Sequence, residues 1–237
     1  MLFKEVEKCK ILVLGDPKVG KTALIRRLSE YTFDEEETHK VGIDVVKKHV
    51  TFGKNNKDNI KKRFTIEIWD TTNQAEFQSL SSGFYRNADG VIICFDLTNY
   101  ESFSNIDYWR NNYEKFTPPQ KVKETPIALF ATKCDLTDDI SVTSKMIEDF
   151  EMDKYKTSAK TGENVEEAFK DFIKKIWMLK RAQKKERDKN RDKNKEKEKS
   201  EENDPGSRQV ITLQPQKHQK FEDKGSMADC SKCFTCG

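Results

Sequence analysis

Long apolar segments are absent from this sequence of 237 residues. No apolar run is long enough to cross a bilayer, and the amino terminus carries no secretory signal. Cys9, Cys94 and Cys134 lie far apart and lack the spacing of a disulfide framework. These absences argue against a membrane-spanning or secreted protein, and we expect an intracellular, reducing compartment.

Charge is distributed unevenly, although the net charge is only +3. Residues 180–237 contain 16 Lys and Arg against 11 Asp and Glu, whereas residues 1–179 contain 28 against 30. The stretch 180–199 has no apolar face, so it either prolongs the last helix as a solvated rod or is disordered. We expect a domain over residues 1–179 and a basic low-complexity tail over residues 180–237. Aromatic residues are not interleaved with the basic ones, which favours an anionic membrane over nucleic acid as the partner of the tail.

The most informative stretch is residues 15–22 (GDPKVGKT), which follows an apolar run over residues 9–14. It has the form G-x-x-x-x-G-K-[ST] in the setting that this motif requires, directly after a strand. Its glycines allow a turn so tight that backbone N–H groups point at phosphate oxygens. Lys21 can reach the β- and γ-phosphates, Thr22 can bind Mg²⁺, and the following helix start favours anions. An ordinary glycine-bearing loop is the alternative, but the complete motif predicts nucleoside triphosphate binding.

Apolar patterning predicts the secondary structure. Strands are expected over residues 11–14, 41–52, 62–69, 90–95, 126–131 and 155–157, with 41–52 and 62–69 forming a hairpin. Helices are expected after the phosphate loop, over 102–116 and 143–150, and from Asn164 onward, with Asn164 as the capping residue. This alternation predicts an α/β domain with a mostly parallel sheet. Ligands bind at the carboxyl ends of such strands, where Gly15, Asp70 and Thr132 fall.

Three more motifs follow the phosphate loop in order: residues 69–74 (WDTTNQ), 132–135 (TKCD) and 157–160 (TSAK). Together the four resemble the Ras superfamily of small GTPases, and residues 31–34 and 84–86 are most similar to its Rab branch. The resemblance covers residues 9–179. It implies a P-loop G domain, with a six-stranded sheet and helices on both faces, that binds GTP or GDP with Mg²⁺ and hydrolyses GTP.

The resemblance also implies roles for individual residues. Asp135 would accept from guanine N1–H and the exocyclic amino group, a donor pair that adenine lacks. Lys133 would pack along the ribose, and Ala159 N–H would meet guanine O6. Phe33 would lie against the base, or would only anchor its loop. The nucleotide-binding residues implied are Gly15, Pro17, Lys18, Val19, Gly20, Lys21, Thr22, Ala23, Phe33, Asp70, Thr132, Lys133, Asp135, Leu136, Ser158, Ala159 and Lys160.

The same resemblance assigns the metal and the chemistry. Thr22 and Asp70 would hold Mg²⁺, and Gln74 would be the catalytic residue that orients the attacking water. Asp135 and Lys133 argue against an ATP-using enzyme.

Three departures from the family pattern concern the γ-phosphate. Lys40 stands where the family has a metal-binding threonine, so Lys40 contacts the phosphate directly or Thr38 replaces the ligand. Asn73 replaces a glycine whose N–H binds the γ-phosphate, and Pro17 removes one N–H from the phosphate loop. We therefore expect nucleotide binding to be retained and hydrolysis to be slow or altered. The segment over residues 142–157 is also about one turn shorter than in relatives.

The carboxyl terminus ends in CSKCFTCG over residues 230–237. The resemblance implies prenylation, with Cys233 and Cys236 as acceptors, although the paired cysteines of the Rab branch are missing. Zinc binding and unmodified cysteines are the alternatives. One prenyl group and a basic segment would suffice for stable membrane attachment.

The sequence thus predicts a Rab-like GTPase switch in membrane traffic, monomeric, on the cytoplasmic face of intracellular membranes and cycling with the cytosol. Effectors, an exchange factor and an activating protein would bind residues 30–46 and 73–85. Val45, Trp69 and Phe84 match the apolar patch by which Rab proteins recognise partners, with core packing as the alternative. The alternative function is a GTP-binding, effector-recruiting module with little or no hydrolysis.

Overall fold

The computed structural model describes residues 7–30, 44–52, 62–71 and 83–202. The strands are β1 Glu7–Gly15, β2 Asp44–Phe52, β3 Lys62–Asp70, β4 Gly90–Asp96, β5 Ile127–Thr132 and β6 Asp153–Lys156. The helices are α1 Lys21–Glu30, α2 Tyr100–Ser104, α3 Ile106–Phe116, α4 Pro119–Glu124, α5 Ser144–Glu148 and α6 Val165–Glu202, with a short 3-10 turn at Thr137–Asp139.

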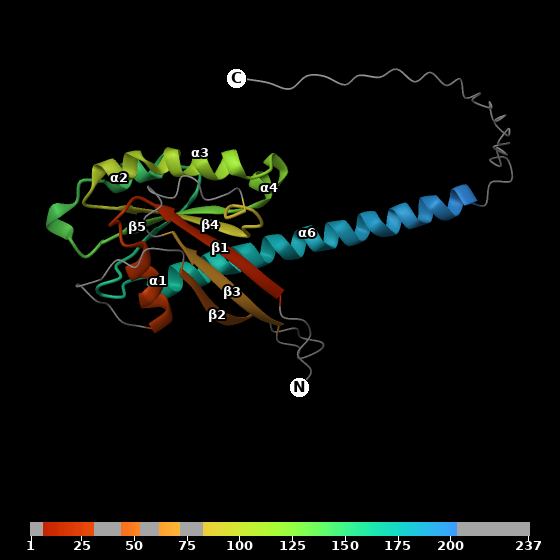
Figure 1. Cartoon of the computed structure of the whole chain (residues 1–237), viewed down its shortest axis with the longest axis horizontal. Helices are drawn as coiled ribbons and strands as arrows, with labels where there is room; N and C mark the ends of the chain where they lie inside the picture. The colour runs from red at the N-terminus through yellow and green to blue at the C-terminus, as the bar shows by residue number, and fades with distance from the viewer. Residues whose placement is uncertain (1–6, 31–43, 53–61, 72–82, 203–237) are drawn as a thin grey trace, which may run out of the picture. The chain divides into compact units, whose positions relative to one another are not determined.

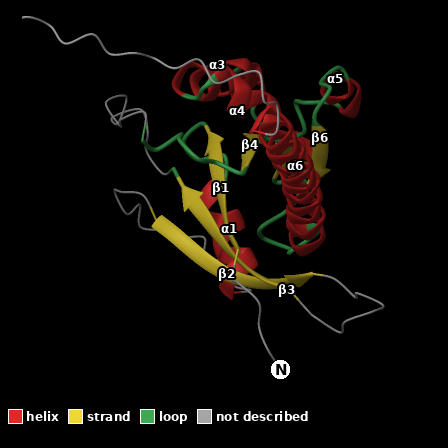
Figure 2. Ribbon diagram, turned by 90° about the vertical axis from the view of Figure 1, so that its right-hand side faces the viewer, coloured by secondary structure: helices red, strands yellow, loops and turns green. Residues whose placement is uncertain are grey.

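The six strands form one sheet in the order β2-β3-β1-β4-β5-β6. All neighbouring pairs are parallel except β2 and β3, which pair antiparallel at one edge (Figure 2). The predicted hairpin strands and the mostly parallel α/β fold are therefore confirmed. The connection between β2 and β3 lies outside the described residues.

Helices cover both faces of the sheet, with α2 and α3 on one side and α1 and the first part of α6 on the other (Figure 1). Strand residues alternate between two buried clusters, as the period of two requires. Ile11 and Val13 of β1 pack with apolar residues of α1 and α6. Leu12 and Leu14 pack with those of α3 and α5. Covering on both sides explains why β4 is buried along its whole length.

One predicted helix was wrong in its extent. The stretch 102–116, expected as one helix, is two helices, α2 and α3, separated at Asn105 (φ −84°, ψ 2°). Asn99 caps α2, because its side chain accepts from the N–H groups of Glu101 and Ser102. A further short helix, α4, was not predicted; it begins at Pro119, directly after Pro118.

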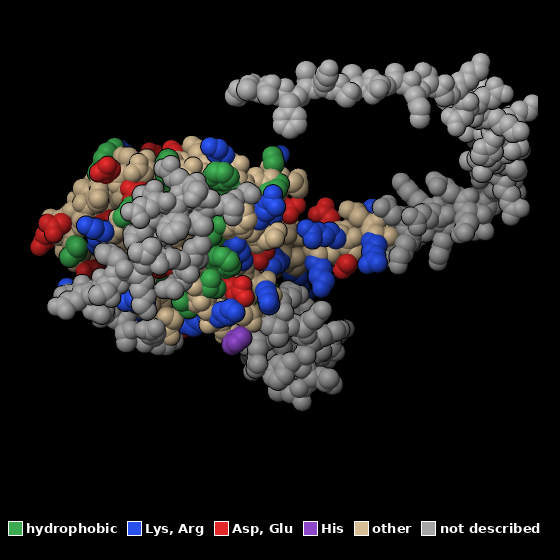
Figure 3. Space-filling model, viewed as in Figure 1, with side chains coloured by type: hydrophobic (Ala, Val, Ile, Leu, Met, Phe, Trp, Pro, Cys, Tyr) green, Lys and Arg blue, Asp and Glu red, His purple; other side chains and the backbone are tan. Residues whose placement is uncertain are grey.

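The last helix begins after Asn164, as expected, and Asn164 O accepts from Ala168 N. Asn164 has a left-handed backbone (φ 54°), and its side-chain amide donates to the Lys156 carbonyl oxygen. Helix α6 then continues to Glu202, so of the two alternatives for residues 180–199 the structure has the helix. Basic side chains outnumber acidic ones along the described part of this stretch (Figure 3).

The chain divides into two compact units, Met1–Asp188 and Lys189–Gly237. The boundary expected after residue 179 falls within α6. In the part of the chain that the structure describes, no helix combines the length and the apolar character needed to cross a bilayer.

Candidate functional site

The phosphate loop joins β1 to α1 and depends on close backbone packing. Gly15 ends β1 at φ 138°, and a Cβ built there would lie 2.2 Å from the carbonyl oxygen of Cys94 in β4. No side chain fits so close an approach, so this position requires glycine. Lys18 and Gly20 also have positive φ angles, 64° and 96°. The loop therefore holds three residues in a conformation that L side chains rarely adopt.

Lys21 is the charged centre of this loop and is only 4% exposed. Its Nζ donates to the carbonyl oxygens of Gly15 at 2.9 Å and Asp16 at 2.7 Å. Burial lowers the pKa of the Lys21 ammonium, while the nearby charges of Asp70 and Asp16 oppose this shift. A buried cation with neutral carbonyl partners is a ready binding group for an anion.

The next residue, Thr22, connects this loop to the end of β3. Its hydroxyl donates to Oδ2 of Asp70 at 2.6 Å, and Asp70 is only 1% exposed. Thr71, just beyond, donates its hydroxyl to the Val13 carbonyl oxygen at 2.6 Å, which fastens the end of β3 to β1. The structure thus brings together the two residues predicted to hold a metal, although they are 48 positions apart.

A hydroxyl and a carboxylate are hard oxygen donors of the kind that Mg²⁺ prefers, so the two residues fit such an ion. Within the described residues, no group of three or more His, Cys, Asp or Glu could hold a metal. At phosphate-binding sites Mg²⁺ is commonly held by one or two protein oxygens together with phosphate oxygens and water.

The remaining phosphate-loop residues take different positions. Pro17 and Lys18 are exposed, Val19 is buried, and Ala23 is half-buried in the first turn of α1. The Val19 carbonyl oxygen accepts from the Thr132 hydroxyl at 2.5 Å, and the same hydroxyl lies 3.0 Å from the Phe95 carbonyl oxygen. Thr132 therefore joins the phosphate loop to the ends of β4 and β5.

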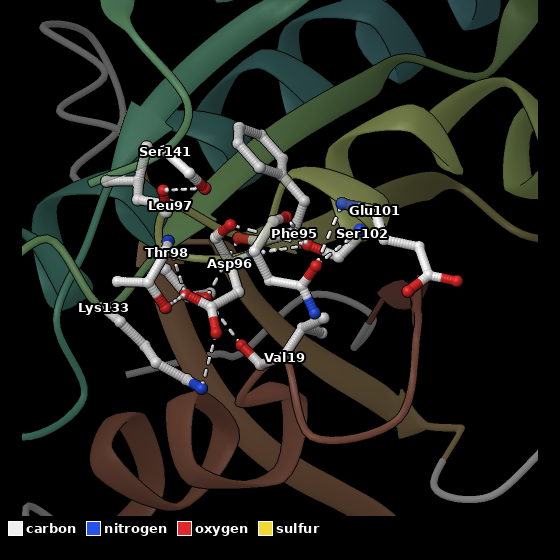
Figure 4. Close-up of polar contacts among 11 residues, drawn as sticks. Val19, Phe95, Asp96, Leu97, Thr98, Glu101, Ser102, Lys133 and Ser141 are labelled. Carbon is white, nitrogen blue, oxygen red and sulfur yellow. Dashed lines mark hydrogen bonds and ion pairs between the residues drawn. The ribbon is translucent and has the colours of Figure 1, made fainter. Parts of the chain in front are cut away.

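Lys133 lies beside Thr132, in the stretch expected to contact the base and ribose. It has a left-handed backbone (φ 58°), and its Nζ is 2.6 Å from Oδ2 of Asp96. Figure 4 shows the carboxylate of Asp96 between Lys133 and Thr98. The other oxygen of Asp96 accepts from the N–H and the hydroxyl of Thr98, at 2.9 and 2.8 Å. This buried carboxylate fixes the direction of the lysine side chain.

The loops after β5 and β6 are joined to each other. Cys134 N donates to the Thr157 carbonyl oxygen at 3.2 Å. Ser158 is fully buried, and its hydroxyl accepts from Thr161 N at 3.1 Å. In the same loop, Ala159 is half-buried and the next residue, Lys160, is exposed. On the other loop Asp135 is half-buried, and Leu136 is 38% exposed.

An arginine from α1 supports the loop after β6. Arg27 donates from Nε to the Ala159 carbonyl oxygen and from Nη2 to the Lys160 carbonyl oxygen, both at 2.6 Å. Neither Arg27 nor Asp96 is among the site residues predicted from the sequence. Neither support has a local signal, because Arg27 lies 132 and 133 positions from its two acceptors and Asp96 lies 37 positions from Lys133.

The three residues of the predicted partner patch differ in exposure. Phe84 is 5% exposed and belongs to a buried cluster, Trp69 is half-buried, and Val45 is 38% exposed. Val45 pairs with Trp69 across β2 and β3, and the rings of Trp69 and Phe84 meet edge to face at 5.8 Å. Phe84 thus packs in the core, which is the alternative to partner contact that was given for it, whereas Val45 is accessible.

Several predicted residues lie outside the described part of the chain. They are Phe33, Thr38, Lys40, Asn73, Gln74, Cys233 and Cys236. The other predicted residues gather where β1, β3, β5 and β6 end, at the carboxyl ends of the parallel strands. Parallel α/β sheets bind ligands at this end of their strands.

Comparison with known proteins agrees with this arrangement. A family model described as the Ras family matches residues 10–178. Ras-related protein RabG2 of Dictyostelium discoideum is 31% identical over 172 residues, which is 71% of this chain and 82% of the relative. Ras-related protein RABG3f of Arabidopsis thaliana and Ras-related protein Rab7 of Cenchrus ciliaris are each 34% identical over 172 residues, or 70% of this chain and 80% of each relative.

Proposed function

The chain belongs to the Ras family of small GTPases, and from this premise we propose that it is a Rab-like switch of membrane traffic with the residue roles given below. Proteins of this family bind GTP and GDP, generally with Mg²⁺, and hydrolyse GTP to GDP. The similarity to Rab7-type proteins supports our assignment of this GTPase activity to intracellular membrane traffic.

The contact between Thr22 and Asp70 is the observation on which the proposal rests. The buried ammonium of Lys21, the residue before Thr22, would bind the β- and γ-phosphates. Backbone N–H groups of residues 15–22 would bind the same phosphates. Thr22 and Asp70 would hold Mg²⁺. The ion supplies positive charge that offsets the charge of the phosphates.

Base recognition is assigned to the two joined loops after β5 and β6. Asp135 would accept from the two guanine donors, and Ala159 N–H would donate to O6. A carboxylate left facing a base without these donors costs free energy, which gives strong discrimination against adenine. Lys133 would lie along the ribose, and its contact with Asp96 supports this role because the carboxylate restricts the rotamers of the lysine.

Gln74 is proposed to orient the attacking water for in-line transfer, and Phe33 to lie against the base. The departures at Lys40, Asn73 and Pro17 lead us to propose that intrinsic hydrolysis is slow. The relatives favour the switch over the alternative of a module without hydrolysis.

We further propose that residues 30–46 and 73–85 recruit effectors, an exchange factor and an activating protein. The tail would attach to an intracellular membrane through a prenyl group on Cys233 or Cys236. The basic, exposed side chains along residues 184–193 support this proposal, because anionic lipid surfaces attract such segments.

The test is single-turnover release of phosphate from Mg²⁺·GTP bound to the full chain. We expect measurable release, slowed by a factor on the order of ten or more in Gln74→Leu, because the water is no longer oriented. Gln120→Leu is the matched control, since Gln120 lies on α4 and its amide donates to the Glu124 carboxylate of the same helix at 2.9 Å. Equal rates in wild type and Gln74→Leu, or no release from tightly bound GTP, would refute the role of Gln74.

A further inference from the structure

The side chain of Asp16 bonds to α3 and to the residue before it, a part of the chain that holds none of the nucleotide contacts proposed above. Nδ2 of Asn105 donates to Oδ2 of Asp16 at 2.7 Å. Nε1 of Trp109 donates to Oδ1 of Asp16, also at 2.7 Å. Each carboxylate oxygen therefore has its own neutral donor, and the two donors come from residues 89 and 93 positions further along the chain.

The position of Asn105 indicates that this contact shapes the local fold. Asn105 lies where α2 ends and α3 begins, a place where asparagine normally caps the following helix. Its side chain makes no capping bond to α3 and bonds to Asp16 instead. The break that divides the predicted single helix thus coincides with the residue whose amide reaches the phosphate loop.

Trp109 anchors the other half of the contact in the core. It is 8% exposed and packs in the same buried cluster as Ile106 and Tyr113 of α3. Because the indole is enclosed, its N–H has a restricted direction, and the carboxylate of Asp16 lies in that direction.

The main chain of Asp16 bonds to Lys21 at the same time. Its carbonyl oxygen accepts from Lys21 Nζ at 2.7 Å. Asp16 thus contacts α3 through its carboxylate and the phosphate-binding lysine through its backbone. We propose that Asp16, Asn105 and Trp109 form a strut by which α3 positions the phosphate loop and Lys21 for nucleotide binding.

The strut would stabilise the backbone conformation of the phosphate loop. Lys18 in this loop has a positive φ angle of 64°, and a non-glycine residue keeps such a conformation only where the surroundings hold it in place. A loop that is already held loses less conformational freedom when phosphate binds, so its affinity is higher. The three residues act as positioning residues, and this role rests on the nucleotide site proposed for the same loop.

The sharpest test exchanges the two partners. Asn105→Asp places a second carboxylate against Asp16, and we expect GDP to dissociate about tenfold faster, because one hydrogen bond is replaced by repulsion. Adding Asp16→Asn to this variant restores a donor–acceptor pair with the roles exchanged, while Oδ1 of the new amide still accepts from Trp109. The double variant should return to within about twofold of wild type.

Asn111→Asp is the matched control, since it makes the same charge change on an exposed residue of α3. The full chain loaded with a fluorescent GDP analogue provides the dissociation rates. A separate readout is the indole N–H proton resonance of Trp109, which Trp109→Phe identifies. It should move upfield in Asp16→Ala, because the carboxylate acceptor is lost, and a packing role alone predicts no such movement.

The outcomes separate the strut from the nucleotide site. If the wild type binds GDP but Asn105→Asp dissociates it at the rate of Asn111→Asp, or if the double variant is not rescued, the strut is refuted while the site stands. A wild type that binds no guanine nucleotide overturns both. Should Asn105→Asp fail to fold, Trp109→Phe replaces it, with about threefold faster dissociation expected from the loss of one donor.

Discussion

The contact between Arg27 and the loop after β6 offers a direct test of how the proposed base site is held. The guanidinium donates to the carbonyl oxygens of Ala159 and Lys160, each at 2.6 Å. Arg27→Lys keeps the positive charge but removes the planar fork, so an ammonium group cannot reproduce two such bonds in this geometry. The substitution therefore isolates the geometry from the charge.

The size of the effect follows from the number and exposure of the bonds. A hydrogen bond involving a charged group contributes about 1.5–3 kcal/mol when buried. Arg27 is half-buried and the released carbonyl oxygens can bind water, so we expect a loss of about 1 kcal/mol. For a domain of this size that lowers Tm by about 2–4 °C. If the loop carries the base contact, GDP should also dissociate about fivefold faster.

Two measurements on the same preparations decide the matter: thermal unfolding of the GDP-loaded chain and dissociation of a fluorescent GDP analogue. Arg110→Lys is the control, because Arg110 makes one exposed bond along its own helix, to Glu114 at 2.9 Å. It should change the free energy of unfolding by less than about 0.5 kcal/mol. A lowered Tm with an unchanged dissociation rate would mean that Arg27 supports the fold without supporting the base loop.

Two further predictions concern the core. A Cβ at Gly90 would lie 2.4 Å from Cδ1 of Ile176, so Gly90→Ala should destabilise the domain by about 1–3 kcal/mol in urea unfolding. Adding Ile176→Val should recover part of that loss, and additive effects of the two changes would contradict this packing. Burial raises the pKa of both the Cys9 and the Cys94 thiol to about 12, so at pH 8 only about one in 10⁴ of these groups is the reactive thiolate. Iodoacetamide should leave both unmodified in the native chain at pH 8 and label them after denaturation, as read by peptide mass; native labelling at the denatured rate would refute their burial.

Local sequence sufficed for the parts of this protein that depend on short-range rules. The phosphate loop is recognisable because its glycines, lysine and threonine act within eight consecutive residues next to a strand. The strands follow from period-two alternation or from continuous apolar runs such as that of β4. Residues that follow β1, β3 and β5 could be assigned to the same end of the sheet, because the carboxyl ends of parallel strands lie together.

The break at Asn105 shows where such rules stop. The apolar spacing over residues 102–116 suits one helix, but the chain breaks at Asn105, whose amide bonds to Asp16, 89 positions earlier. The contacts of Arg27 and Asp96 with the loops after β6 and β5, and the burial of Phe84, likewise depend on partners from other elements. Helical and strand periodicity describe which face of an element is apolar, but they do not say which distant polar group will meet it. These groups come within hydrogen-bonding distance only in the folded domain. There the strands take the order β2-β3-β1-β4-β5-β6 and helices pack on both faces of the sheet.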